Sequence, residues 1–325
     1  MVNKVKPDWT GDDLLSRFVN LMIQTKPIYR LMTHQARQVI IKTAEKNGIA
    51  WEQNCKTLEK SPAKSLLSQI TNPDVVYPDY YLVPFHAYDQ GNLCWKAAFE
   101  AVPATQSLGL RVWKNEDLTW QEAQDRLRAA FHAVLEPYSP PQVENILDIG
   151  CSIGVSTKAT HRYYSQRQNN LPINTIGLDL SPYMLAVAKV TDEEQEISQW
   201  IHGLAEKTNF DDNSFDVITI QFVLHELPRD AATAIFKEVF RILRPGGVLG
   251  IVDNNPRSEV IQNLPPALFM LMKSTEPHSD DYYTFNVEQT LQELGFDYQT
   301  TFPSDHRHRT IVATKPSRRS IHSHS

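Results

Sequence analysis

Short apolar segments alternate with longer segments of helical character between residues 143 and 253, and this alternation constrains the fold more than any other feature. The apolar segments are 144–150, 174–180, 215–223 and 247–253. Each has the length of a strand, and the stretches between them are long enough for the crossover helices that parallel strands require. The pattern therefore predicts an α/β domain built on a parallel sheet with helices on both faces.

The first 140 residues show a different pattern, mostly of helical spacing. Helices are predicted within 12–70: one with apolar positions at helical spacing from Leu14, one from Pro27 to about Gly48, one over 51–60 and one after Ser61-Pro62. Residues 72–113 are rich in proline and aromatic side chains and have no clean period, which predicts an ordered but irregular segment. A capping box of Thr119 and Glu122 begins another helix over 119–136.

Three prolines at 137, 140 and 141 mark the predicted domain boundary. We expect a mainly helical N-terminal region over 1–140 that covers the substrate. The α/β domain is expected over 141–316, with an insertion at about 256–286, and the polar tail at 317–325 is expected to be disordered.

Composition excludes several classes of function. The chain has 325 residues, 41% of them hydrophobic, and a formal net charge of -6, which is not the basic balance of a nucleic-acid binder. No apolar run is long enough to cross a membrane. A secretory signal has an apolar stretch after its basic residues, and none follows the N-terminal lysines here. The three cysteines lie far apart, which predicts neither a disulfide framework nor a zinc site and favours a cytoplasmic location.

The segment 146–157 carries the strongest chemical signal. An apolar strand leads into a turn that contains Gly150 and Gly154, and a helix begins near Ser156. Glycines allow a ligand to approach the backbone, and a helix N-terminus attracts negative charge. The dinucleotide fingerprint needs glycine at the first, third and sixth places, and Ser152 and Val155 occupy the last two. A nicotinamide-dependent enzyme is therefore disfavoured.

The same turn resembles the D-x-G-x-G-x-G pattern of class I S-adenosylmethionine-dependent methyltransferases, with Ser152 at the middle glycine. Three further segments follow in the order of that family. A second strand ends at Asp179, the segment 202–227 is similar to GDAxxLPFxDxSFDxV with Leu204 at the aspartate, and 240–253 is similar to the LRPGG turn. The ordered set is most similar to the ubiquinone- and menaquinone-type small-molecule methyltransferases.

This resemblance implies a Rossmann-like fold, with a seven-stranded, mostly parallel sheet whose last strand is antiparallel, and a helical N-terminal extension. A helix at about 286–294 and the segments 296–302 and 309–316 would supply the closing antiparallel pair. It implies transfer of a methyl group from S-adenosyl-L-methionine to a small-molecule acceptor at carbon, oxygen or nitrogen, by in-line displacement, with S-adenosyl-L-homocysteine as product. The implied cofactor-binding residues are Asp148, Gly150, Cys151, Ser152, Gly154, Asp179, Leu180, Met184, Leu204, Ala205, Glu206 and Gln221.

The acceptor side of the site is less defined. His225 follows the fourth predicted strand and is the candidate catalytic residue, as a general base. It could instead simply open a helix with Glu226, which as its neighbour in a helix is badly placed to orient it. The aromatic segment near 77–95 and the insertion could enclose the substrate or could pack between domains. The candidate substrate-binding residues are Tyr80, Tyr81, His86, His225, Asp253 and Tyr283.

No metal is expected from the sequence. Asp253-Asn254 occupy the place of a magnesium-binding pair in the catechol-type branch, but Gln221 on the fourth strand is a poor ligand for a hard cation. Two other functions remain open: methylation of nucleic acid or protein, and a non-catalytic protein that keeps the cofactor fold. The oligomeric state is also open.

Overall fold

The computed structural model describes residues 14–317, so the predicted tail beyond Ser317 and the first 13 residues lie outside it. The central sheet has seven strands in the order β3-β2-β1-β4-β5-β7-β6. Five of them are parallel, and β7 is antiparallel to both of its neighbours. The predicted α/β class and the antiparallel last strand are thus confirmed. The strands are β1 (Asn145–Ile149), β2 (Asn174–Asp179), β3 (Gln199–His202), β4 (Phe215–Gln221), β5 (Leu243–Asn254), β6 (Asp297–Pro303) and β7 (His308–Thr314).

Both faces of the sheet are covered, as the apolar strands require. On one face, α9 (Arg229–Ile242) and α13 (Val287–Glu293) contribute to the larger hydrophobic core. On the other face, α6 (Trp120–Leu135) and α7 (Val155–Arg167) contribute to a second core. The remaining crossover helix, α8 (Pro182–Thr191), is capped at its N-terminus by Ser181, whose hydroxyl accepts a hydrogen bond from the Met184 amide.

Helix α6 packs directly on the sheet, although it precedes the predicted boundary at residue 140. A side chain added at Gly250 of β5 would lie 2.9 Å from atoms of both Phe131 and Leu135 of α6. The glycine therefore lets the helix approach the strand closely. Helix α6 contacts α5 of the N-terminal region and also α7, β5 and β7, so it connects the N-terminal helices to the sheet.

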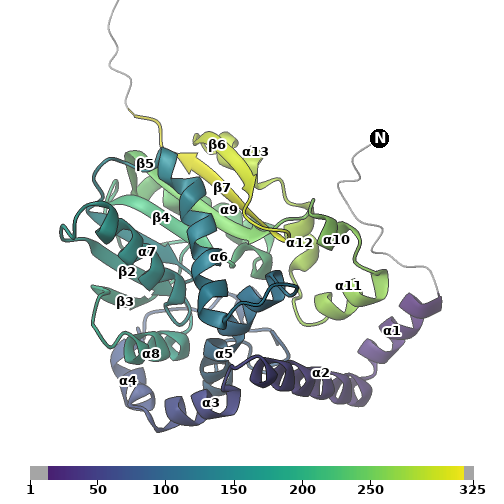
Figure 1. The fold of residues 1–325 in the computed structure, drawn as a ribbon. Helices are drawn as coiled ribbons and strands as arrows, with labels where there is room; N and C mark the ends of the chain where they lie inside the picture. Colours follow the sequence, from purple (N-terminus) through teal and green to yellow (C-terminus); the bar gives the residue numbers. More distant parts are fainter. Residues whose placement is uncertain (1–13, 318–325) are drawn as a thin grey trace, which may run out of the picture.

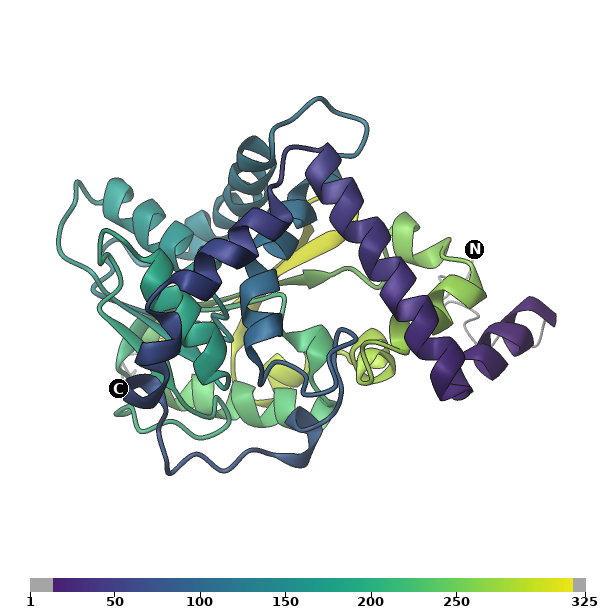
Figure 2. The ribbon, with the colours of Figure 1, turned by 90° about the horizontal axis from the view of Figure 1, so that it is seen from below.

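The N-terminal helices lie together on one side of this domain, below it in Figure 1 and across the view in Figure 2. They are α1 (Leu14–Gln24), α2 (Lys26–Lys46), α3 (Trp51–Lys60), α4 (Ala63–Ile70) and α5 (Trp95–Val112). Helices α4 and α5 pack against α8, whereas α1 packs against α11 (Pro266–Lys273) of the insertion. The insertion also contains the short helices α10 (Glu259–Gln262) and α12 (Ser279–Thr284).

The prediction of an irregular segment over 72–113 is wrong for its second half, which forms α5. Pro103 lies inside this helix and has no N–H to donate to the carbonyl of Phe99. The Cys55 thiol of α3 donates to that carbonyl at 3.6 Å instead. A contact from another helix thus replaces the lost bond, which a local sequence pattern cannot show.

No helix within residues 14–317 is both long enough and apolar enough to cross a membrane.

Candidate active site

The turn after β1 depends on its glycines. Gly150 has φ +67 and Gly154 has φ +77, in the left-handed region that glycine adopts without strain. A Cβ at Gly150 would lie 2.5 Å from Val223 Cγ2, and one at Gly154 would lie 2.3 Å from the Trp200 ring. Ser152 adopts φ +48, so the residue that replaces the middle glycine keeps a glycine-like conformation.

Asp179, at the end of β2, holds this turn in place. Its Oδ2 accepts a hydrogen bond from the Ser152 amide and its Oδ1 accepts one from the Ser181 amide, both at 2.7 Å. Burial raises the pKa of Asp179 to about 6, although these bonds oppose the rise. Each carboxylate oxygen has a second lone pair, so the ionised group can still accept bonds from a ligand's hydroxyls.

Asp148 lies beneath the turn. The hydroxyls of Thr157 in α7 and Thr219 in β4 each donate to it at 2.6 Å, and only 1% of the residue is exposed. It joins α7 to β4 and does not line the cavity described next. Asp148, predicted to bind the cofactor, therefore supports the turn from below and has no direct access to the cavity.

A cavity of about 740 Å³ lies at the carboxyl ends of the parallel strands, where open α/β sheets bind their ligands. Its volume is in the usual range for small-molecule sites, roughly 300–1,000 Å³. The α/β domain, the N-terminal region and the insertion all contribute walls. The predicted site residues that line it are Tyr80, Tyr81, His86, Gly150, Cys151, Ser152, Asp179, Leu180, Met184, Ala205, Glu206, Gln221 and His225.

The remaining predicted residues lie elsewhere. Gly154 and Leu204 are adjacent to lining residues but are not part of the wall. Tyr283 is 2% exposed in the hydrophobic core, where its ring packs against Phe269 and Tyr282. It is not among the described residues that line the cavity, because α12 turns this side chain toward the core.

His225 faces the cavity and is oriented by Asp253 of β5. Asp253 Oδ1 lies 2.8 Å from His225 Nδ1, and its Oδ2 accepts the His225 backbone amide at 3.2 Å. Burial alone would lower the pKa of His225, but the charge and hydrogen bond of Asp253 outweigh it and raise that pKa to about 10. Asp253, predicted as a substrate ligand, does not line the cavity; its carboxylate orients His225 and favours the protonated imidazole.

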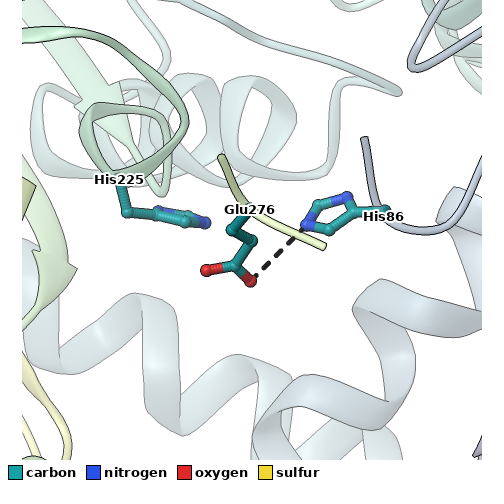
Figure 3. Close-up of side chains that lie close together, drawn as sticks. All are labelled: His86, His225 and Glu276. Carbon is teal, nitrogen blue, oxygen red and sulfur yellow. Dashed lines mark ion pairs between the residues drawn. The ribbon is translucent and has the colours of Figure 1, made fainter. Parts of the chain in front are cut away.

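Three side chains from separate segments meet in this cavity: His86, His225 and Glu276 (Figure 3). One ligand atom from each lies within 4.8 Å of those of the other two. His86 precedes α5, His225 lies in the 3-10 turn after β4 (Leu224–Glu226), and Glu276 lies between α11 and α12. Glu276 is not among the residues predicted from the sequence, where its only signal is its place in the polar loop that follows an apolar helix.

The segment before α5 is fastened to the cofactor side of the cavity. The Asn72 amide donates to Nδ1 of His202, so Nε2 carries the proton and donates to the Leu180 carbonyl at 3.2 Å. The Tyr80 hydroxyl donates to Glu206, and the Ser181 hydroxyl donates to the Asn92 carbonyl at 2.6 Å. These contacts hold the aromatic segment over the end of β2.

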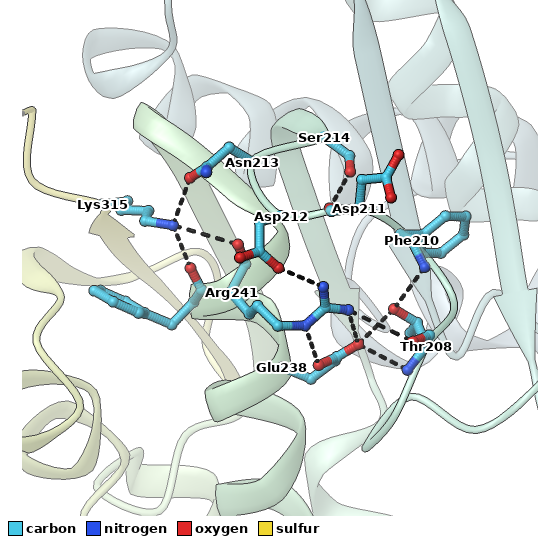
Figure 4. Close-up of polar contacts among 10 residues, drawn as sticks. Thr208, Phe210, Asp211, Asp212, Asn213, Ser214, Glu238, Arg241 and Lys315 are labelled. Carbon is cyan, nitrogen blue, oxygen red and sulfur yellow. Dashed lines mark hydrogen bonds and ion pairs between the residues drawn. The ribbon is translucent and has the colours of Figure 1, made fainter.

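A second polar cluster, in residues that do not line the cavity, fixes the loop before β4 (Figure 4). Arg241 of α9 pairs with Glu238 and Asp212 at 2.7 Å, and Glu238 accepts the Thr208 amide at the same distance. Lys315 donates to Asn213 Oδ1 at 2.8 Å. The acidic and polar residues at 208–213, within the segment 202–227 that resembles the family pattern, therefore hold the loop against α9 and the chain after β7.

Comparison with known proteins agrees with this geometry. Residues 147–251 match the family model of a methyltransferase domain. An uncharacterized methyltransferase from Synechocystis sp. is 31% identical over 45% of this chain and 64% of its own length. A demethylmenaquinone methyltransferase from Staphylococcus epidermidis is 34% identical over 37% of this chain and 55% of its own length.

The chain thus spans between about half and two thirds of these curated relatives. A solved SAM-dependent methyltransferase from Aquifex aeolicus aligns with 63% of this chain and 97% of its own, at 16% identity and a TM-score of 0.44. The family match covers the glycine turn, the end of β2 and the strand that precedes His225. Residues 147–251 therefore form a methyltransferase domain.

Proposed function

We propose that this protein transfers a methyl group from S-adenosylmethionine to a small molecule that carries a ring and an acidic hydroxyl or enol. One observation carries the proposal: a single cavity is lined both by the glycine turn with Asp179 and by His225 with Glu276. A donor held at the first group of residues and an acceptor held at the second would therefore share one enclosed space. Such proximity is the main contribution an enzyme makes to a displacement reaction.

The residues on the donor side fit the cofactor. The positive φ of Gly150 lets the backbone turn directly after β1, and the carboxylate of Asp179 has lone pairs for ribose hydroxyls. Ala205 and Glu206 line the wall where the resemblance places the adenine. When bound, S-adenosylmethionine supplies a methyl group already activated by a positively charged sulfur.

The residues on the acceptor side combine an apolar wall with a charged end. Phe85, Leu268 and Met272 line the same cavity as His225 and Glu276. This combination suits a ring with an apolar substituent and a polar edge, and relatives 34% identical over part of this chain bear the name demethylmenaquinone methyltransferase. The net charge of -6 also favours a small molecule over a nucleic acid.

The positive charge of His225 defines its role. Because its pKa is raised to about 10, Nε2 is protonated at neutral pH and can donate to an acceptor oxygen. The acceptor's hydroxyl proton leaves to water, and His225 stabilises the anion that remains. With S-adenosylmethionine held by the glycine turn and Asp179, the anion would displace the methyl group from the positively charged sulfur and leave a neutral thioether. His225 thus acts by stabilising charge, whereas the sequence suggested a general base.

Calorimetric titration with S-adenosylhomocysteine tests the cofactor, with NAD as comparison. We expect micromolar affinity for the first and no binding of the second. Incubation with labelled methyl donor and a panel of hydroxylated naphthalenes and quinols, chemically reduced where necessary, then tests the acceptor class. Binding of S-adenosylhomocysteine without labelling of any panel member would reject the acceptor class and retain the cofactor. Lack of binding would reject the proposal as a whole.

A further inference from the structure

The cluster of His86, His225 and Glu276 has the composition of a metal site. Two imidazoles and one carboxylate come from three separate segments and converge inside the cavity (Figure 3). The proposed methyl transfer gives a chemical step to His225 alone, places Glu276 beside the acceptor, and does not use His86. We propose that these three side chains bind one divalent transition-metal ion of the zinc or iron(II) kind.

The distances are close to those of a formed site. With bonds of roughly 2.1 Å, two ligand atoms on one metal lie about 3.0–3.4 Å apart. Glu276 Oε1 lies 3.8 Å from His86 Nε2, and all three ligand atoms lie within 4.8 Å of one another. Small side-chain rotations close this difference. They are available to His86, whose side chain is 41% exposed.

His225 is oriented as a metal-binding histidine usually is. Its Nδ1 donates to Asp253 Oδ1 at 2.8 Å, which leaves Nε2 directed toward the cluster. Metal-binding histidines nearly always donate their other ring N–H to a carboxylate or a carbonyl, which fixes the ring and increases its basicity. In the metal-bound state the ion takes the place of the Nε2 proton, so the positive charge next to the acceptor then comes from the metal and no longer from protonated His225.

The backbone at His86 is held in an uncommon conformation. His86 has φ +49 and Ala87 has φ +63, two consecutive residues other than glycine in the left-handed region. The His86 amide donates to the carbonyl of Thr275 at 2.9 Å, so the loop is fastened to the residue directly before Glu276. Strained backbone of this kind concentrates at functional sites. Here it places the His86 ring beside the carboxylate.

The ligand set selects the kind of metal. Imidazole nitrogen suits zinc, iron and copper, whereas magnesium and calcium prefer oxygen ligands throughout. Three protein ligands leave coordination positions open, as in catalytic metal sites. If the proposed methyl transfer is correct, an open position would bind the acceptor oxygen and lower the pKa of its hydroxyl. This site is distinct from the Asp253-Asn254 magnesium pair considered from the sequence, since Asp253 only orients His225.

Direct metal binding tests this proposal without any assay of methyl transfer. The full chain, without an affinity tag, should carry His322→Ala and His324→Ala, because the paired histidines near the C-terminus could bind metal themselves. After treatment with a chelator, zinc is titrated by calorimetry and cobalt(II) by absorbance. We expect one ion per chain and a cobalt spectrum of nitrogen and oxygen ligands without a thiolate charge-transfer band.

Three single variants in this background decide the assignment. His86→Ala and Glu276→Gln should each weaken zinc binding at least about a hundredfold, since loss of a ligand exceeds the 10–100-fold effect of losing a supporting group. His278→Ala is the matched control, because His278 lines the same cavity outside the cluster and should leave the affinity unchanged. Absence of stoichiometric binding, or equal affinity in His86→Ala, Glu276→Gln and the parent, would overturn the proposal. S-adenosylhomocysteine titrations of the same samples report separately on the cofactor site.

Discussion

Asp253 contacts His225 through both of its carboxylate oxygens, one to the imidazole Nδ1 at 2.8 Å and one to the backbone amide at 3.2 Å. The strand β5 thus determines both where the residue sits and which way its ring faces. The side chain of Asp253 is only 2% exposed, so water does not compete for these bonds. The pair is a rigid unit that directs Nε2 into the cavity.

Replacement of Asp253 by asparagine should impair turnover and spare cofactor binding. The amide keeps the size of the side chain but removes the charge that stabilises protonated His225, so kcat should fall by about 10–100-fold. The KM for S-adenosylmethionine should change less than about twofold, because Asp253 does not line the cavity. Steady-state kinetics with both substrates measures this difference.

A merely structural role for Asp253 would produce a different result. It would lower the melting temperature and affect both kinetic constants, with no separation between kcat and KM.

Binding of S-adenosylhomocysteine should weaken as the pH falls below about 6. Burial raises the pKa of Asp179 to about 6, so the group gains a proton on acidification and loses acceptor capacity for the ribose hydroxyls. Affinity falls on acidification because the ionised form of Asp179 is the form that accepts the ribose hydrogen bonds. Calorimetric titrations from about pH 5 to about pH 7 should show Kd rising at the acid end, since model α-carboxyl and α-amino groups titrate outside this interval.

Asp179→Asn and Asp179→Ala separate the charge from the hydrogen bonds of this residue. The asparagine variant should bind with an affinity that no longer depends on pH over this interval. The alanine variant should bind at least about tenfold more weakly, since it loses a charge-assisted contact of roughly 1.5–3 kcal/mol. An asparagine variant with the same pH dependence as the parent would assign the titration to another group.

The fold could be predicted largely because its signals are local. Each strand and crossover helix is encoded in a contiguous segment, and the capping residues Thr119 and Ser181 mark helix starts that the structure confirms. Helix α5 could not be predicted because the bond that stabilises it around Pro103 comes from Cys55. The sheet contact of α6 likewise depends on Gly250, which is distant in sequence.

In the candidate site, too, the residues in short local motifs could be predicted, whereas the grouping of residues distant in sequence could not. The glycine turn and Asp179 belong to short motifs, so a sequence pattern could identify them. The grouping of His86, His225 and Glu276 depends on three distant segments that only the folded chain brings together. The orientation of His225 also required a residue on the neighbouring strand β5, whereas the sequence offered only adjacent Glu226.

Gly150→Ala should destabilise the protein by more than the cost of placing alanine in the left-handed conformation. Alanine in the left-handed conformation costs about 1–2 kcal/mol, and the new Cβ would also lie 2.5 Å from Val223 Cγ2. Gly48→Ala is the matched control, since Gly48 has φ +80 with no atom within 4 Å of an added Cβ. Thermal unfolding should show a larger decrease in melting temperature for Gly150→Ala than for Gly48→Ala. Only Gly150→Ala should bind S-adenosylhomocysteine at least about tenfold more weakly. Equal decreases in melting temperature would mean that Val223 moves aside and that its contact with the new Cβ costs nothing.

Tyr81 and Tyr283 should respond to truncation in opposite ways, although the sequence places both in the same class of substrate-binding candidate. Tyr81 lines the cavity, so Tyr81→Ala should raise the KM for the acceptor at least about fivefold, because a ring contact of about 1 kcal/mol is lost. Tyr283 is 2% exposed in the core, so Tyr283→Ala should lower the free energy of unfolding by about 3–5 kcal/mol. Urea unfolding and acceptor kinetics measure the two effects, and Tyr283→Phe keeps the ring if the alanine variant does not fold. An acceptor KM raised by Tyr283→Phe and unchanged by Tyr81→Ala would place the substrate against α12.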